Sequence, residues 1–164
     1  MVIPLGLEPG EKTVMKQRPI SPTAPLFTKY MISRIVLVAG VMAVLALSLY
    51  AYFEINYDHG YAQTMVFTAL VVIQWANAFN ARSLYESAFS RLRTWSRPFW
   101  IGLTLAVTLQ LIALFGPLQS VFHIHPVSLG HLALVSGIAF LSAILVVEIH
   151  KAIGRKLYQS REDA

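Results

Sequence analysis

Three amide side chains stand at helical spacing inside one long apolar stretch, and these residue types could bind a cation. Gln74 and Asn77 are three residues apart, so they project from nearly the same side of a helix, and Asn80 lies a further turn along. Unpaired amides are costly in hydrocarbon, so these side chains should face protein or a hydrated cavity. Amide oxygens suit alkali or alkaline-earth cations, which indicates one wall of a cation site centred on Gln74.

The same spacing has a plainer interpretation, which is hydrogen bonding between packed helices. One or two amides cannot complete a coordination shell of about six oxygens, so the spacing alone favours this second interpretation. A separate metal site is conceivable at His123 and His125, which alternate in a loop and could turn toward one zinc or copper ion. Histidines without neighbouring carboxylates are more typical of solvent-facing positions. Glu148 ends an apolar tract and fits an interfacial charge better than an intramembrane site.

The stretches that carry these residues are those of a membrane protein. Of the 164 residues, 56% are hydrophobic and only 13% are charged, whereas about a quarter are charged in soluble domains. An uncharged tract from residue 98 to residue 147 would reach about 75 Å as one helix, so it must turn back near Gly116-Pro117 and His125-Pro126. We therefore expect an all-α protein with four transmembrane helices. The predicted helices cover residues 35–53, 61–81, 99–115 and 129–149.

The basic residues predict how these helices are oriented. Five Lys or Arg residues precede the first helix, four lie between the second and third, and four follow the last, which accounts for all 13. The positive-inside rule then places both termini in the cytoplasm of a multi-pass protein of the cell membrane. The cytoplasmic parts would be an N-terminal segment, residues 1–34, and a tail, residues 150–164, on either side of the membrane domain, residues 35–149. Cationic clusters separated in this way indicate a lipid bilayer as the partner, with no nucleic acid.

Three segments resemble one family of pumps. The stretch from Thr64 to Ser83, which reads TMVFTALVVIQWANAFNARS, resembles the eighth transmembrane helix of calcium-type P-type ATPases. The N-terminal segment, with Gly6-Leu-Glu-Pro-Gly-Glu11 and Arg18-Pro19, is similar to the cytoplasmic loop before the seventh helix of those pumps. Glu148-Ile-His-Lys151 resembles the exit from their tenth helix. The resemblance covers nearly the whole chain and implies the fold of the C-terminal support bundle, helices seven to ten.

The resemblance also implies roles for the amides. Gln74 falls where the family places its eighth-helix cation ligand, and Asn77 and Asn80 match supporting positions. Some calcium pumps have Glu at this ligand position, and a neutral amide would weaken or remove one of two calcium sites. The implied cargo is Ca²⁺, with fewer ions carried per cycle. The loop Arg18-Pro-Ile-Ser21 departs from the family's usual double proline and arginine.

The machinery for ATP hydrolysis is missing from the sequence. A P-type pump needs an Asp-Lys-Thr-Gly phosphorylation site, but the two aspartates, Asp58 and Asp163, are not followed by lysine. No phosphate-binding glycine-rich loop is present either. We therefore expect no catalytic residues and no bound cofactor here, with ATP and Mg²⁺ confined to a catalytic portion elsewhere. The chain would be a membrane-support fragment or split subunit of a cation pump, or else an autonomous four-helix binding or regulatory protein derived from one.

The predicted topology can be tested by cysteine labelling, because the chain contains no cysteine of its own. Asp58→Cys and His125→Cys should both react with a membrane-impermeant maleimide added outside intact cells. Ala152→Cys should react only after the membrane is opened. Labelling of Asp58→Cys and His125→Cys from opposite sides would contradict the four-helix topology.

Overall fold

A computed structural model describes residues 29–81 and 97–162, with side chains as far as Gly154. The described residues form helices joined by short connections and include no strand. The four long helices are each long and apolar enough to cross a membrane, which confirms the predicted all-α class. These helices are α2 (Lys29–Asn56), α3 (His59–Ala81), α5 (Arg97–Phe115) and α6 (Leu129–Glu162), with a short 3-10 helix η2 (Pro117–Gln119) between the last two.

The helix positions agree with the sequence, but two helices are longer than the uncharged tracts that predicted them. α2 begins before Arg34 and continues past Glu54, and α6 continues through the basic residues to Glu162. Charges end a hydrophobic tract without ending a helix, because the backbone hydrogen bonds of a helix form equally well outside hydrocarbon. Part of the predicted tail, residues 150–164, is therefore helical. Most of the predicted segment 1–34 lies outside the described residues.

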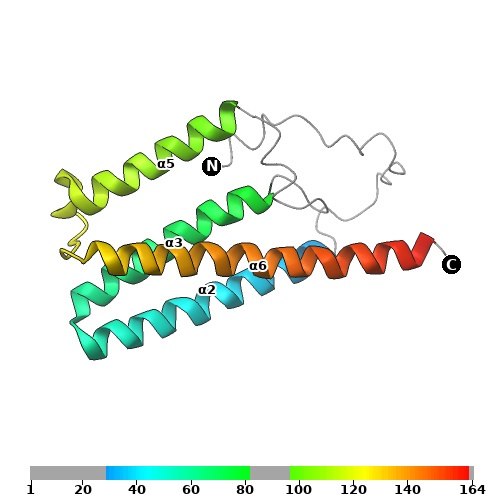
Figure 1. Ribbon diagram of the computed structural model, residues 1–164, viewed down its shortest axis with the longest axis horizontal. Coiled ribbons are helices and arrows are strands. Elements are labelled where there is room, and N and C mark those ends of the chain that lie inside the picture. Colours follow the sequence, from blue (N-terminus) through cyan, green and yellow to red (C-terminus); the bar gives the residue numbers. More distant parts are fainter. Residues whose placement is uncertain (1–28, 82–96, 163–164) are drawn as a thin grey trace.

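Two turns of the chain, between α2 and α3 and between α5 and α6, lie at the same end of the molecule (Figure 1). The connection from α2 to α3 and the connection from α5 through η2 to α6 lie side by side at this end, which we call the loop end. The start of α2 and the end of α3 lie at the opposite end, which we call the terminal end. This arrangement is the up-and-down order that the sequence predicted.

Small side chains bring α3 and α6 together. On α3, Ala62, Ala69 and Ala76 recur every seventh residue, and each is completely buried. On α6, Ala139 and Ala143 recur at four-residue spacing between two buried valines, Val135 and Val147. Lipid is as apolar as a leucine side chain, so helices in a bilayer associate through close packing, and small residues allow the backbones to approach. The α3–α6 contact is therefore the centre of the bundle, and α2 packs against both helices.

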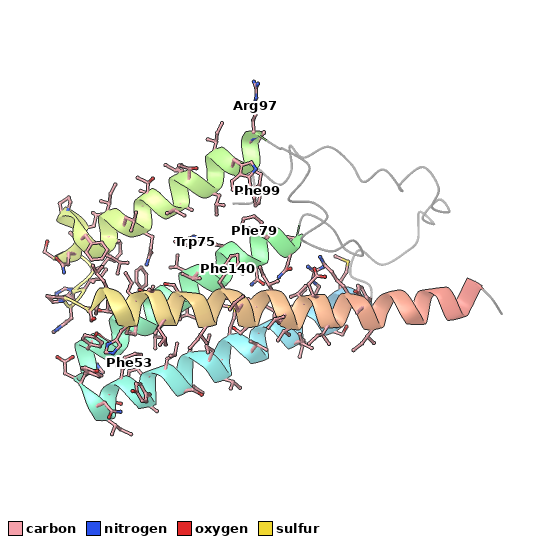
Figure 2. All side chains as sticks on the ribbon, in the orientation of Figure 1. Phe53, Trp75, Phe79, Arg97, Phe99 and Phe140 are labelled. Atoms are coloured by element: carbon pink, nitrogen blue, oxygen red, sulfur yellow. The ribbon has the colours of Figure 1, made fainter. Side chains whose placement is uncertain are left out.

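α5 is held near its two ends. At the terminal end, Phe99 points from α5 toward Phe79 on α3 (Figure 2), with ring centroids 5.0 Å apart. Phe79 also meets Phe140 of α6, at 6.0 Å between centroids and nearly perpendicular. Toward the loop end, Ala113 and Leu114 of α5 form a second buried cluster with Ile124 of the following connection. Edge-to-face aromatic pairs of this kind contribute about 0.5–1.5 kcal/mol beyond the area they bury.

Enlarging one of the small residues should separate α3 from α6. Ala69→Leu adds three carbons to a site with no free space, and overpacking of this kind costs about 1–3 kcal/mol. The unfolding midpoint, measured by titrating SDS into detergent micelles, should fall. Ala43→Leu, on an exposed part of α2, is the matched control and should leave the midpoint unchanged. Equal midpoints for both variants would show that the α3–α6 packing is loose.

Candidate functional site

Gln74 lies on an open side of the bundle. Its side chain is exposed, within the part of α3 that is apolar enough to span a membrane. The amide nitrogen of Gln74 lies 3.8 Å from the sulfur of Met42 on α2, a weak acceptor. No other hydrogen bond of this side chain occurs among the described residues. Among the described residues, the Gln74 amide therefore has only this weak contact.

The side chain of Asn80 points into the bundle, away from the open side where Gln74 lies. Its side chain is 1% exposed, and its Nδ2 donates to the backbone oxygen of Ala143 on α6, at 3.3 Å. Asn77 is half-buried and lies between these extremes. Each step of three residues turns the helix by about 60°, so two steps carry a side chain about 120° around the axis. The three amides therefore do not line one wall, and Gln74 alone is presented outward.

The loop end contains most of the histidines, where the sequence suggested a metal site. His123 and His125 are both exposed, and His123 has a positive φ of 52°. Among the described residues, no group of three or more His, Cys, Asp or Glu side chains could hold a metal ion. The structure thus offers no support for zinc or copper binding by His123 and His125.

His125 joins the two connections at the loop end. Its backbone N–H donates to Oγ1 of Thr64 on α3, at 3.1 Å, and its Nδ1 lies 3.8 Å from Oδ2 of Asp58. Asp58 caps α3, because its Oδ1 accepts the backbone N–H of Tyr61 at 2.6 Å. The ring of His125 fills the space beside Gly60, where a β-carbon would collide with it. The connection before α6 is therefore seated directly on the first turn of α3.

A second contact at the loop end was not visible in the sequence. Tyr57 and Tyr61 stack at 4.7 Å between ring centroids, and the two hydroxyls lie 3.3 and 2.8 Å from Nε2 and Nδ1 of His131. The hydroxyl of Tyr61 also accepts the backbone N–H of Ser128, at 3.1 Å. About seventy residues separate these partners, and no local pattern links residues so distant in the chain. Tyrosine side chains are typical of a membrane interface, but that property does not indicate which residues they contact.

Glu148 lies at the terminal end of the predicted span. Its Oε1 is 3.7 Å from Nζ of Lys151, one turn further along α6. Lys151 is completely buried although the sequence placed it among solvent-facing charges. Burial of a lysine beside a carboxylate is tolerated because the pair is partly neutralised. This geometry supports a structural charge pair at Glu148.

Comparison with known proteins shows to which family the chain is related. The family of cation-transporting ATPase C-termini matches residues 1–153. The chain belongs to this family. A calcium-transporting ATPase of Bacillus subtilis is 31% identical over 147 residues, 87% of this chain and 16% of the relative. Calcium-transporting ATPase type 2C member 1 of Homo sapiens is 30% identical over 157 residues, 92% of this chain and 16% of that protein.

A calcium-transporting ATPase of Listeria monocytogenes is 28% identical over 160 residues, 96% of this chain and 18% of that pump. The chain therefore corresponds to a C-terminal portion of these ATPases and spans less than a fifth of their length. The resemblance found in the sequence is confirmed at the level of the family. The matched residues 1–153 include nearly all of the four helices, among the described residues, that are long and apolar enough to cross a membrane.

In this ATPase C-terminal chain, Gly60→Ala should loosen the loop end. The added β-carbon would occupy the space of the His125 ring, so the connection before α6 would have to lift away from α3. The backbone amide of His125 should then exchange hydrogen for deuterium faster, as measured by mass spectrometry in lipid nanodiscs. Gly137→Ala is the control, because nothing lies within 4 Å of a β-carbon there. An unchanged exchange rate at His125 in Gly60→Ala would contradict the contact.

Proposed function

We propose that the chain is the C-terminal membrane bundle of a calcium-type cation pump, and that the Gln74 amide supplies one ligand of the transported cation. The observation that carries the proposal is the exposure of Gln74 at the depth of the membrane. An amide facing lipid leaves its polar atoms unpaired, at a cost of several kcal/mol in hydrocarbon. Helices from outside this chain, together with a cation, would satisfy that group.

The surface of α2 supports an assembly of this kind. The most apolar part of α2 has no buried residue, although the helix lies beside α3 and α6. An open apolar groove of about 440 Å³ runs along it, and a β-carbon on Gly40 would have no neighbour within 4 Å. The groove is lined by Val36, Leu37, Gly40, Val41, Val44, Leu45 and Ser48. A transmembrane helix of the same pump fits this surface, because a glycine in a groove permits close approach of backbones.

The location follows from the arrangement of the helices and the charges. The start of α2 and the start of α6 lie at opposite ends of the bundle. In the sequence, each basic cluster is next to a helix end that lies at the terminal end. By the positive-inside rule we place the terminal end in the cytoplasm and the loop end outside the cell membrane. A catalytic portion of the pump would then meet the bundle on its cytoplasmic side.

Catalysis belongs to the remainder of the pump. This chain would position the membrane helices of the pump and supply one oxygen ligand for the cation. Phosphoryl transfer requires other groups, which hold phosphates and Mg²⁺. ATP and Mg²⁺ would act in the rest of the pump, which corresponds to the other four fifths of the relatives' length. The chain would not hydrolyse ATP by itself.

A chimeric pump tests the ligand role. The matching C-terminal part of the Bacillus subtilis calcium-transporting ATPase is replaced by this chain, and calcium-dependent ATP hydrolysis is followed against calcium concentration. Gln74→Leu should raise the half-saturating calcium concentration about tenfold or more, because a bond to a charged group is worth about 1.5–3 kcal/mol. Expression and membrane insertion should be preserved.

Gln63→Leu provides the matched control for this experiment. It removes another exposed amide from the same helix, near the loop end, where it contacts His59 at 2.9 Å. Calcium dependence should be unchanged in this variant. Equal calcium dependence in Gln74→Leu and the parent chimera would refute the ligand assignment. Failure of the chain to associate with any catalytic portion, although it inserts stably alone, would favour an autonomous four-helix protein.

A further inference from the structure

A polar link ties three helices together at the terminal end. Nη2 of Arg34 on α2 donates to the backbone oxygen of Asn80 on α3, at 2.7 Å. The side chain of Asn80 in turn donates to the backbone oxygen of Ala143 on α6, at 3.3 Å. Asn80 therefore accepts from one neighbouring helix and donates to the other. We call the chain of contacts Arg34, Asn80 and Ala143 the three-helix link.

The link attaches to a part of α3 where a cation is favoured. Asn80 is the residue before Ala81, where the described helix ends, so its carbonyl lies in the last turn of α3. The carbonyl end of a helix also carries partial negative charge, which attracts a guanidinium group. A hydrogen bond from a charged donor is about twice as strong as a neutral one. Arg34 therefore fixes the end of α3 firmly relative to α2.

Two further contacts at this end join α2 to α6. The hydroxyl of Ser33 lies 2.9 Å from Nε2 of His150, and the ring of Tyr30 packs on the same imidazole at 4.6 Å. These contacts join α2 to α6 only. The three-helix link, by contrast, joins α3 to both α2 and α6.

The direction of Gln74 depends on how α3 is rotated. Gln74 lies six residues before Asn80, which places it about 9 Å along the helix and about 120° around it. With Asn80 turned inward to Ala143, Gln74 must point outward. Because Ile73 and Trp75 are the neighbours of Gln74, a rotation of α3 by one residue would replace the amide on the open side with one of these two side chains.

We propose that Arg34 and Asn80 are positioning residues that set the rotation of α3 and so present Gln74 to the cation. This inference rests on the proposed function for the role of Gln74, but the rotation itself can be measured without a cation or a pump. Neither residue contacts the cation in this proposal, since both lie at the terminal end of the bundle.

Spin labelling in lipid nanodiscs measures the rotation. Single cysteines are introduced in turn at positions 71 to 77, and the chain has no native cysteine to interfere. Oxygen accessibility of the attached nitroxide should be greatest at position 74 and low at the buried positions 72, 73 and 76. In Asn80→Leu, and separately in Arg34→Leu, the maximum should move from position 74 to a neighbouring position. Arg34→Lys keeps a charged donor and should shift the accessibility maximum less.

Thr68→Val is the matched control, because it removes a buried hydroxyl that bonds within α3, to the oxygen of Thr64 at 2.9 Å. It should leave the maximum at position 74. A maximum that stays at 74 in both Asn80→Leu and Arg34→Leu would overturn the proposal. So would loss of membrane insertion in both while Thr68→Val inserts, because the link would then serve folding alone. A shifted maximum combined with a Gln74→Leu pump of unchanged calcium affinity would support the positioning and refute only the ligand role.

Discussion

Close packing of α3 against α6 through small side chains is the interaction on which the rest of the bundle depends. A bilayer gives helices no hydrophobic reason to associate, so stability comes from van der Waals contact and from polar groups that find partners. Ala69 and Ala139 bring the two backbones together, and both are completely buried. α2 packs against this pair along the length of α2, and α5 contacts the pair near the two ends of α5.

Polar contacts are concentrated at the two ends of the apolar core, and they act in different ways. At the loop end, His125 and His131 fasten the connection before α6 to the first turns of α3. At the terminal end, Asn80 joins helices directly. Between these ends the exposed amide of Gln74 remains without a strong partner among the described residues. This polar group does not hold the described helices together, so it is available to another component.

The sequence predicted the spans well, because hydrophobicity and charge are properties of single residues. α3 begins two residues before the predicted helix 61–81 and ends with it at Ala81, and α5 ends at Phe115 before the Gly-Pro break. It did not predict that Asn80 points away from Gln74, because the acceptor of the Asn80 amide, the backbone oxygen of Ala143, lies on a helix that is distant in the sequence. It also missed the contact of Tyr57 and Tyr61 with His131, which joins distant parts of the chain.

The length of α6 gives the bundle a mechanical property. Its 34 residues make a rod about 51 Å long without an internal proline, whereas the hydrocarbon layer is about 30 Å thick. The half of the rod toward the loop end is clamped against α3 through Ala139 and Ala143. Further along, α2 holds the rod again at His150, through Ser33 and Tyr30. The part of α6 beyond these contacts continues to Glu162 as a lever. A small tilt of α6 within the bilayer would produce a larger sideways displacement of its end near Glu162. Movement of the transmembrane helices would thus be transmitted to a structure outside the membrane.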